Sequence, residues 1–502
     1  MARMTKVIDL PSMTKLNKAN GQISTQLIHI FRAAVQRGDL QSGDALPSSR
    51  GLAQTLNVAR GTVIEAYEQL IAEGVFESHA RKGTFVSQTL NHSTTATLKR
   101  EKQETDIPLT VAAQAFSEIL KEFRPLPHRP FAVSVPIGRT QPNEMWRKYG
   151  NQYRARGIAA PSGYDDPQGI LSLRIAIADY VRRSRSVHCE PEQIVITSGI
   201  QQALYICSQI LFNANDMVWV EDPAYRGTTA ILEHSLHHLK IVRVPVDEEG
   251  IQVNIGRALA EHARAAFVTP SHQYPMGMPM SLARRTELLA WAKQQDAWII
   301  EDDYDSELRY SGQPFPALQG MGTDQVIYLG TFSKVLFPSL RLGYAILPKK
   351  LVAPFCGLRA LIDRHPPSAD QHVLAAFIQE GHLERHIRRI RKVYAENRLQ
   401  LIDLVERYIP KHLGFLQSGD QGMHMLLWLA DHLNDLTIAQ TALEAGISIK
   451  AVSPTYSNQT KRSGLILGLG DFDVSQMEQA VAKLAKIIQH HDTVKTKIAS
   501  IQ

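Results

Sequence analysis

The sequence predicts a chain of at least two domains: a small N-terminal domain of three helices and a β-ribbon, and a large α/β domain with a smaller C-terminal lobe. Three observations support this prediction. At 502 residues the chain is too long for one ordinary core. Residues 1–88 combine helical apolar patterns with two short strand-like runs. From residue 109 to 502 short apolar runs alternate with helical spacers, which is typical of a mostly parallel, doubly wound sheet.

Composition restricts the class of protein. Hydrophobic residues make up 44% of the chain, enough for globular packing. The three cysteines, Cys189, Cys207 and Cys356, lie far apart and match no metal or disulfide framework, which favours a reducing cytoplasm. No run of 18 apolar residues occurs and the start lacks the apolar core of a signal peptide, so we expect a cytoplasmic protein without a membrane span. The net charge of +6 permits contact with a polyanion but does not establish it.

The first 88 residues have the pattern of a helix-turn-helix. Apolar residues recur at helical spacing over 23–35, and Gly38 ends that run. A second helix is expected to begin at Pro47, with Ser48 or Ser49 as its cap. After a short turn at 57–59, an apolar stripe that begins at Val63 indicates a third helix. Two helices joined by so short a turn make a helix-turn-helix.

Several residues around these helices suit duplex DNA. The start of the third helix lies off the apolar stripe and would enter a major groove, where a glycine allows close backbone approach. The runs 75–78 and 83–86 predict a hairpin whose basic tip, Arg81 and Lys82, suits a wing against the DNA backbone. Residues 1–87 contain 10 Lys and Arg against 7 Asp and Glu, an excess too small to indicate DNA binding by itself. The prediction of DNA binding therefore rests on the sequence pattern. The predicted DNA-binding residues are Arg50, Arg60, Gly61, Thr62, Lys82 and Gly83.

Residues 89–108 form the predicted connection between the domains. This stretch is polar and mixed in charge, so it has little apolar surface to bury. We expect it to be a tether that lets the domains move independently, with a charged helix as the alternative.

The large domain is predicted from seven strand-like runs with helical spacers. The runs are 194–196, 217–220, 241–244, 266–268, 298–300, 326–329 and 344–347. From about residue 369 onward, helices and a few strands should form the smaller lobe.

The run 326–329 ends at Gly330, so Thr331, Ser333 and Lys334 are expected in a loop at the carboxyl end of a strand, where α/β sheets hold their ligands. Arg341 follows seven residues after the lysine. One amine, two hydroxyls and a guanidinium suit an aldehyde that carries a phosphate, because the amine can form a Schiff base while the others hold the phosphate. Pyridoxal 5'-phosphate (PLP) is the obvious candidate.

A second phosphate-binding element follows the run 194–196. The segment Ser198, Gly199 and Ile200 turns from a strand into a helix, and free amides at a helix start attract phosphate. The acidic cluster at 301–307 could also suggest a metal site, but no paired histidine ligands accompany it, so no metal is predicted.

The motifs resemble one known family. Gly-Thr-Phe-Ser-Lys at 330–334, followed by Pro-Ser-Leu-Arg, resembles the lysine loop of the MocR/GabR family of bacterial regulators. That family joins a GntR-type winged helix to a fold-type I aminotransferase-like domain. The segments 46–50, 60–63 and 81–85 resemble the GntR-type winged helix, and the whole resemblance runs from about residue 22 to residue 469.

The resemblance implies roles for further residues. Lys334 would hold PLP as a Schiff base, and the ring of Tyr225 would stack on the cofactor. Asp302 would pair with the pyridine nitrogen, with Asp303 as the competing assignment, and Tyr304 would lie near the ring hydroxyl.

Three implied roles concern other parts of the site. The segment 269–277 takes the place of the aminotransferase Asn-Pro-Thr-Gly loop but lacks the asparagine, so His272, Gln273 and Tyr274 all remain candidates for the ring hydroxyl. Tyr164 would touch the phosphate of the partner in a homodimer. Arg462 is the nearest match for an arginine that binds an effector carboxylate.

Together these features predict a PLP-dependent, DNA-binding transcription regulator. An amino compound, or PLP itself, would bind the aminotransferase-like domain and alter how a homodimer binds the half-sites of a promoter operator. The main alternative is a working aminotransferase with an accessory DNA-binding domain. A further alternative is a large domain that binds an unrelated metabolite without PLP.

Overall fold

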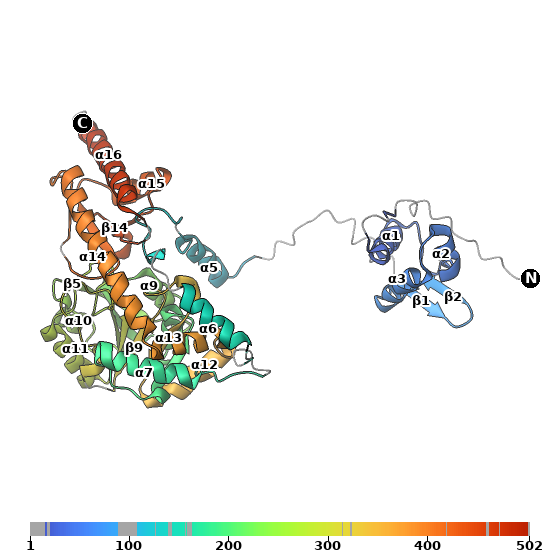
Figure 1. Cartoon of the computed structure of the whole chain (residues 1–502), viewed down its shortest axis with the longest axis horizontal. Coiled ribbons are helices and arrows are strands. Elements are labelled where there is room, and N and C mark those ends of the chain that lie inside the picture. Colours follow the sequence, from blue (N-terminus) through green and yellow to red (C-terminus); the bar gives the residue numbers. More distant parts are fainter. Residues whose placement is uncertain are drawn as a thin grey trace, which may run out of the picture. The chain divides into compact units, whose positions relative to one another are not determined.

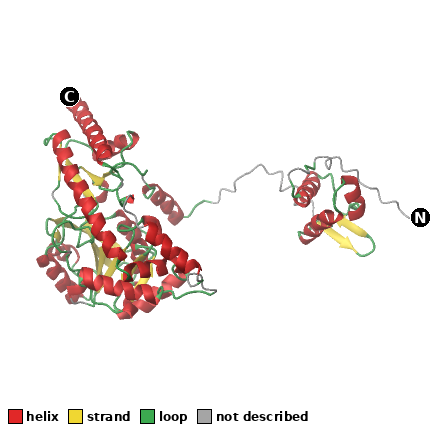
Figure 2. Ribbon diagram, viewed as in Figure 1, coloured by secondary structure: helices red, strands yellow, loops and turns green. Residues whose placement is uncertain are grey.

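The computed structural model describes residues 16–17, 21–88, 108–125, 127–138, 143–155, 157, 163–313, 315–321, 324–417, 419–457, 461–470 and 472–499. The predicted tether, 89–108, lies outside these ranges except for its last residue. Contacts divide the chain into two compact units, one up to Val111 and one from Ala112 onward. The two units are drawn in Figures 1 and 2 and are described separately below.

The N-terminal unit is a winged helix. Its elements are α1 (Ile23–Arg37), α2 (Ser49–Leu56), α3 (Arg60–Ala72), β1 (Phe76–His79) and β2 (Gly83–Val86). The predicted helices and hairpin are therefore confirmed. The Ser48 hydroxyl accepts a hydrogen bond from the Gly51 amide at 3.1 Å, which identifies Ser48 as the cap of α2. Asn57 is left-handed (φ 49°) and ends that helix, so the turn into α3 is short.

An aromatic cluster holds this unit together. The rings of Phe31, Tyr67 and Phe76 meet edge to face, with centroids 5.3 to 5.6 Å apart. The Tyr67 hydroxyl also donates a hydrogen bond to the Pro47 carbonyl at 2.9 Å. Because Tyr67 lies on α3 and Pro47 precedes α2, this bond fixes the two helices of the helix-turn-helix relative to each other.

Phe31→Ala should destabilise this unit more than any surface change. Phe31 is fully buried, so its removal leaves a cavity and is expected to cost about 3–5 kcal/mol of unfolding free energy. Hydrogen exchange of peptides from residues 23–86, measured in the full chain, would report the loss. The exposed Glu68→Ala on α3 is the matched control and should change the unfolding free energy by less than about 0.5 kcal/mol. Equal exchange in the two variants would contradict the central place of the aromatic cluster.

The large unit is built on an eight-stranded sheet of order β3-β10-β9-β8-β7-β4-β5-β6. The strands are β3 (Ile194–Thr197), β4 (Met217–Asp222), β5 (Lys240–Asp247), β6 (Gly250–Ile251), β7 (Ala265–Val268), β8 (Trp298–Asp303), β9 (Val326–Thr331) and β10 (Gly343–Ile346). All seven predicted runs are strands, and β6 is an addition. Neighbours from β9 to β5 pair in parallel, whereas β10 is antiparallel to both β3 and β9.

Helices cover both faces of this sheet (Figure 2). They are α6 (Asn143–Ala155), α7 (Leu171–Arg185), α8 (Ile200–Ile210), α9 (Arg226–Glu233), α10 (Val253–Ala260), α11 (Leu282–Gln295), α12 (Lys349–Asp363) and α13 (Ser368–Gln379). Helix α5 (Val111–Glu122) has no buried residue and contacts α9 through the ion pair of Glu122 with Arg226. Side chains alternate along each strand, so Val218 and Val220 join a core with α8 and α12, whereas Trp219 stacks on Trp291 of α11 at 3.8 Å. The sheet is thus doubly wound, as the sequence predicted.

The smaller lobe contains a four-stranded antiparallel sheet of order β11-β12-β14-β13. Its elements are α14 (His382–Tyr408), β11 (Gly414–Leu416), β12 (His424–Leu429), α15 (Asp435–Glu444), β13 (Lys450–Ala451), β14 (Gly464–Gly468) and α16 (Val474–Ala499). The Gly468 amide donates to the Phe131 carbonyl at 3.0 Å, so a segment far upstream joins this lobe.

The smaller lobe begins later in the chain than the predicted start at about residue 369. Helix α13 spans that position, yet it packs against α6 and α7 of the large sheet. It is buried along most of its length because it lies between those helices and α14. The lobe therefore begins with α14.

No helix in the part of the chain that the structure describes is long and apolar enough to cross a membrane.

Candidate functional site

The strand register brings the predicted phosphate-binding segments together. Gly343 on β10 pairs with Thr197 of β3 on one side and with Thr331 of β9 on the other. A Cβ at position 343 would lie 2.8 Å from the Gly199 Cα and 2.8 Å from the Gly330 carbonyl oxygen, so only glycine fits there. The turn at 198–200 and the lysine loop therefore emerge side by side.

The polar groups around this junction match a phosphate. Gly199 has φ 97° and caps α8, which leaves the first amides of that helix free for an anion. The Arg341 guanidinium donates to the Ser198 carbonyl and lies next to Gly199. The Ser333 amide donates to the Thr331 hydroxyl at 3.1 Å, while the buried Ser333 hydroxyl has no hydrogen-bond partner among the residues that the structure describes. A buried hydroxyl without a partner is costly, and a phosphate oxygen would satisfy it.

Lys334 lies beside these groups. Its amine forms no hydrogen bond or ion pair with any residue that the structure describes. Burial lowers the pKa of Lys334 to about 8, against the opposing effect of Asp305 and Asp302. A lysine in this state has a substantial neutral fraction near physiological pH, so its amine can act as a nucleophile.

The two competing acids at the end of β8 have different surroundings. Asp303 accepts hydrogen bonds from Arg185 at 2.8 Å and from Tyr328 at 2.5 Å. Each acid has one buried oxygen, Oδ1, without a hydrogen-bond partner among the described residues, but Asp302 has no arginine beside it. Burial raises the pKa of Asp302 to about 8, with Asp303 raising it further and Lys334 opposing. Asp303 is therefore committed to the fold, whereas the Asp302 carboxyl is available to a ligand.

Tyr304 belongs to a hydrogen-bonded chain that the sequence did not reveal. Its hydroxyl lies 3.0 Å from the His272 Nδ1 atom, which is 2.9 Å from an Asp305 carboxylate oxygen. Because a carboxylate only accepts, the Nδ1 hydrogen points toward Asp305 and the Tyr304 oxygen shares it, which leaves the Tyr304 hydrogen free.

The three candidates for the ring hydroxyl in the 269–277 segment differ in their contacts. The Gln273 amide donates to Glu221 at 3.1 Å and to the Pro223 carbonyl at 2.8 Å, so both of its hydrogens are already used. His272 belongs to the chain just described. Tyr274 meets the ring of Tyr225 edge to face at 5.7 Å, and its own ring lies 6.2 Å from that of Tyr304.

His424 of β12 completes a group of three buried residues with His272 and Asp305. Their candidate ligand atoms lie within 4.8 Å of one another. Sequence reasoning missed this group because its two histidines are far apart in the chain. One nitrogen of each histidine is already hydrogen-bonded, Nδ1 of His272 to Asp305 and Nε2 of His424 to the Pro275 carbonyl at 3.1 Å, so the group has the contacts of a polar network.

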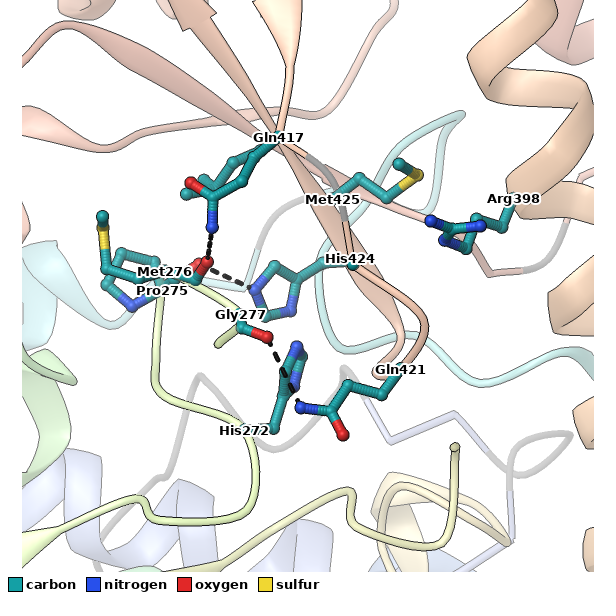
Figure 3. A pocket seen from close by; sticks show the side chains of 11 residues that line it. His272, Pro275, Met276, Gly277, Arg398, Gln417, Gln421, His424 and Met425 are labelled. Atoms are coloured by element: carbon teal, nitrogen blue, oxygen red, sulfur yellow. Dashed lines mark hydrogen bonds between the residues drawn. The ribbon is translucent and has the colours of Figure 1, made fainter. Parts of the chain in front are cut away.

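Two small cavities of about 20 Å³ each adjoin these residues. One lies beside Tyr225 and Asp302. The other lies between the 272–277 segment and the smaller lobe, and Figure 3 shows the side chains that line it, including Arg398 of α14.

Two predicted residues lie at the surface. Tyr164 is 83% exposed, and Arg364 lies over its ring at 5.7 Å. Arg462 is also exposed and its guanidinium stacks on the Trp428 ring at 4.0 Å, outside the lining of either cavity.

In the N-terminal unit, the predicted DNA-binding residues are exposed, except that Thr62 is half-buried. Arg60 at the start of α3 approaches the Ser49 hydroxyl at 3.5 Å, next to Arg50 of α2, so the two arginines lie on one side of the motif. A Cβ at Gly61 would meet no atom within 4 Å, so the fold does not require this glycine. Lys82 lies at the exposed tip of the hairpin, where Arg81 (φ 65°) is left-handed.

Comparisons with known proteins match both units. Residues 23–86 match the family of bacterial regulatory proteins called gntR, and residues 144–484 match aminotransferase class I and II. The probable rhizopine catabolism regulatory protein MocR of Rhizobium meliloti is 33% identical over 461 residues, 91% of this chain and 92% of that protein. The pyridoxine biosynthesis transcriptional regulator PdxR of Corynebacterium glutamicum is 33% identical over 466 residues, 93% of this chain and 96% of that protein.

A solved structure supports the fold of the large unit. LysN, the α-aminoadipate aminotransferase of Thermus thermophilus, superposes with a TM-score of 0.67 at 24% identity and covers 80% of this chain and 99% of its own. The fold and the lysine site thus define a helix-turn-helix protein with an aminotransferase-like domain. The chain belongs to the MocR/GabR type of HTH-type transcriptional regulators.

Proposed function

We propose that this regulator holds PLP on Lys334. An amino compound, or PLP itself, bound there changes the affinity of the regulator for promoter DNA. The observation that carries the proposal is a set of three buried groups that have no hydrogen-bond partner among the described residues: the Lys334 amine, the Asp302 Oδ1 atom and the Ser333 hydroxyl. Unpaired buried polar groups are costly in a folded protein, and these three match the aldehyde, the pyridine nitrogen and the phosphate of PLP in turn.

When bound, PLP supplies an electrophilic aldehyde and a ring that withdraws electrons once its nitrogen is protonated. The chain's own residues supply the rest. Asp302 would hold the proton at the ring nitrogen, and the free Tyr304 hydrogen would donate to the ring hydroxyl. Arg341, Ser333 and the amides that begin α8 would hold the phosphate, and the ring of Tyr225 would cover the cofactor.

Asp302→Asn and Asp303→Asn should affect different properties of the chain. Comparing them tests which of the two acids pairs with the pyridine nitrogen. Asp302→Asn should weaken PLP binding but leave the cofactor-free chain at least as stable as the wild type. Asp303→Asn leaves Arg185 buried without its charge partner, so it is expected to cost about 3–5 kcal/mol of unfolding free energy. PLP titration by absorbance and denaturant unfolding of the cofactor-free variants measure the two effects.

The pH dependence gives a second readout for Asp302. Its pKa is raised from 3.8 to about 8, so the folded cofactor-free chain keeps a proton that the unfolded chain releases. Stability contributed by this group should therefore fall as pH rises through that range, and Asp302→Asn should remove this part of the slope. If Asp303→Asn removes the PLP affinity and Asp302→Asn does not, our assignment of the acid is wrong.

We further propose a homodimer whose interface includes Tyr164. Tyr164, Leu361 and Ile362 are 83%, 84% and 44% exposed, which is unusual for large apolar side chains near one another. Hydrogen bonds connect this surface to the phosphate turn: Gln202 accepts from the Ser198 amide at 2.8 Å and donates to Asp363 at 3.0 Å. A twofold contact through this surface would place each Tyr164 near the other subunit's phosphate turn.

Leu361→Asp should weaken this dimer, because it places a charge within an apolar interface. Sedimentation equilibrium is expected to show at least a tenfold weaker association, with the α12 helix content unchanged. Leu436→Asp, on the smaller lobe and 53% exposed, is the matched control. A wild-type chain that sediments as a monomer would contradict the proposed homodimer.

We propose a sensing role for the site rather than turnover, and a location in the cytoplasm, where a bacterial regulator meets its DNA. The winged helix supports this view, because transamination has no need of a DNA-binding domain. The test is to select duplexes from a random pool with the full chain and then to measure their binding with and without PLP and a panel of amines. An unchanged affinity under every condition would contradict the proposal. Keto-acid formation at ordinary enzyme rates with the same amines would favour a working aminotransferase.

A further inference from the structure

His272 is a buried residue whose ring is held by contacts from both lobes of the large unit. Its Nδ1 atom lies 2.9 and 3.0 Å from the two carboxylate oxygens of Asp305. That carboxylate also accepts a hydrogen bond at 3.3 Å from the amide of Met423, which precedes β12 of the smaller lobe. A Cβ at Gly422 would overlap the His272 ring, and a Cβ at Gly277 would lie 3.3 Å from its Nε2 atom (Figure 3). The backbone of these two segments therefore leaves the ring little room to turn.

The contact with Asp305 decides which nitrogen of His272 carries a hydrogen. A carboxylate only accepts, so Nδ1 must be the donor. The Tyr304 hydroxyl lies 3.0 Å from the same Nδ1 atom. A nitrogen that carries a hydrogen cannot accept another, so Tyr304 meets His272 with its oxygen. This hydroxyl forms no second hydrogen bond within the part of the chain that the structure describes, so its own hydrogen is available to a ligand.

Tyr304 lies in the same surroundings as the lysine amine. Asp305 and Asp302 raise the pKa of Tyr304, and both also oppose the lowering of the pKa of Lys334 by burial. Burial is the largest cause that holds the pKa of Tyr304 well above its ordinary value, and the groups that face it raise the pKa further. These groups are Asp305, Tyr274, Asp302 and Glu221. The Tyr304 hydroxyl therefore keeps its hydrogen and can donate it in the space that it shares with Lys334.

We propose that His272 is a positioning residue: its Nδ1 hydrogen, oriented by Asp305, binds the Tyr304 oxygen and so directs the Tyr304 hydrogen to the ring hydroxyl of PLP. This inference rests on the proposed function and deepens it. It assigns to His272, acting through Tyr304, the role of the asparagine that the 269–277 segment lacks. Gln273 has no hydrogen to spare for that role.

The hydrogen bond from His272 should also make Tyr304 a stronger donor, because hydrogen bonds in a chain polarise one another. A donor at the ring hydroxyl draws electron density from its oxygen. That oxygen then holds less tightly the proton that it shares with the nitrogen of Lys334, so this proton is lost at a lower pH. The visible absorption band reports that loss.

The first test compares His272→Asn with His272→Leu in the full chain loaded with PLP. The two new side chains are similar in size, but only asparagine places a nitrogen donor near the position of Nδ1. His272→Leu should raise the pH midpoint of the absorption band by about one unit, and His272→Asn should recover most of that shift. His412→Leu, at an exposed position between α14 and β11, is the matched control and should titrate as the wild type.

The second test measures whether His272 acts through Tyr304. His272→Leu should bind PLP about tenfold more weakly than the wild type. It should bind the PLP analogue that lacks the ring hydroxyl as the wild type does, which also shows that the variant is folded. In the Tyr304→Phe background, His272→Leu should cause no further loss of PLP affinity, because the residue through which it acts no longer carries a hydroxyl.

Three results would overturn the inference: an unchanged midpoint in His272→Leu, a midpoint in His272→Asn shifted as far as in His272→Leu, or losses of PLP affinity that add in the double variant. Each of them leaves the proposed function intact, because the wild type still binds PLP. A wild-type chain that takes up no PLP would overturn both.

Discussion

Lys334→Ala is expected to abolish the covalent attachment of PLP. Mixing wild-type chain with PLP should produce a visible absorption band, and borohydride should then fix one PLP per chain, detectable by mass spectrometry. The alanine variant has no amine at the site, so it should show neither the band nor the added mass. The cavity and the phosphate-binding groups remain, so the variant should still bind PLP reversibly and more weakly.

The lowered pKa of Lys334 predicts the pH dependence of attachment. Only the neutral amine attacks an aldehyde, and the pKa falls from 10.5 to about 8 in the folded chain. At pH 7.5 roughly a quarter of such amines are neutral, against about one in a thousand for an ordinary lysine. The attachment rate should therefore rise with pH up to about pH 8 and level off above it.

Lys450→Ala is the matched control for Lys334→Ala. Lys450 lies in β13 and is close enough to contribute to the lowered pKa of Lys334. Its removal should therefore keep the band and move the pH midpoint slightly upward. A band that survives in Lys334→Ala, together with borohydride-stable PLP, would place the attachment on another lysine.

The second large effect is expected from Arg60→Ala in the winged helix. Arg60 is exposed at the start of α3, next to Ser49 and Arg50, where a groove-facing helix would reach base edges. Loss of one such contact costs about 1–3 kcal/mol, and a homodimer would lose it at both half-sites. Fluorescence anisotropy with a selected duplex should show the affinity falling by on the order of a hundredfold.

Arg37→Ala separates this effect from a loss of positive charge. Arg37 is half-exposed and ion-paired with Asp39 at the end of α1, away from the start of α3. The Arg37→Ala variant should therefore bind the selected duplex with almost unchanged affinity. Arg60→Ala should leave PLP uptake unaffected, and simultaneous loss of both activities would show that the two units depend on each other.

Local patterns predicted most of the fold. The apolar stripe of α3, the seven strand runs and the lysine loop after β9 depend on neighbours in sequence, and each lies where the pattern placed it. Sheet direction is a different matter. The run at 344–347 forms a strand, but nothing local shows that β10 is antiparallel to both neighbours. The same limit applies to α13, whose apolar sequence does not indicate which lobe it packs against.

The site shows a similar limit. Adjacent residues of a strand face opposite sides, so Asp302 and Asp303 must differ in role. Only the fold shows that Arg185 and Tyr328 both bind the Oδ2 atom of Asp303. The cavity beside Arg398 could not be predicted at all, because its walls come from segments more than a hundred residues apart.

The position of β10 has a consequence for synthesis on the ribosome. β3 pairs only with β10 in the large sheet, so the edge that carries the phosphate turn stays open until residues 343–346 have been translated. The winged helix, complete by residue 86, can fold much earlier. A nascent chain therefore acquires its winged helix long before the proposed cofactor site is complete, and any message truncated before codon 343 would yield the first without the second.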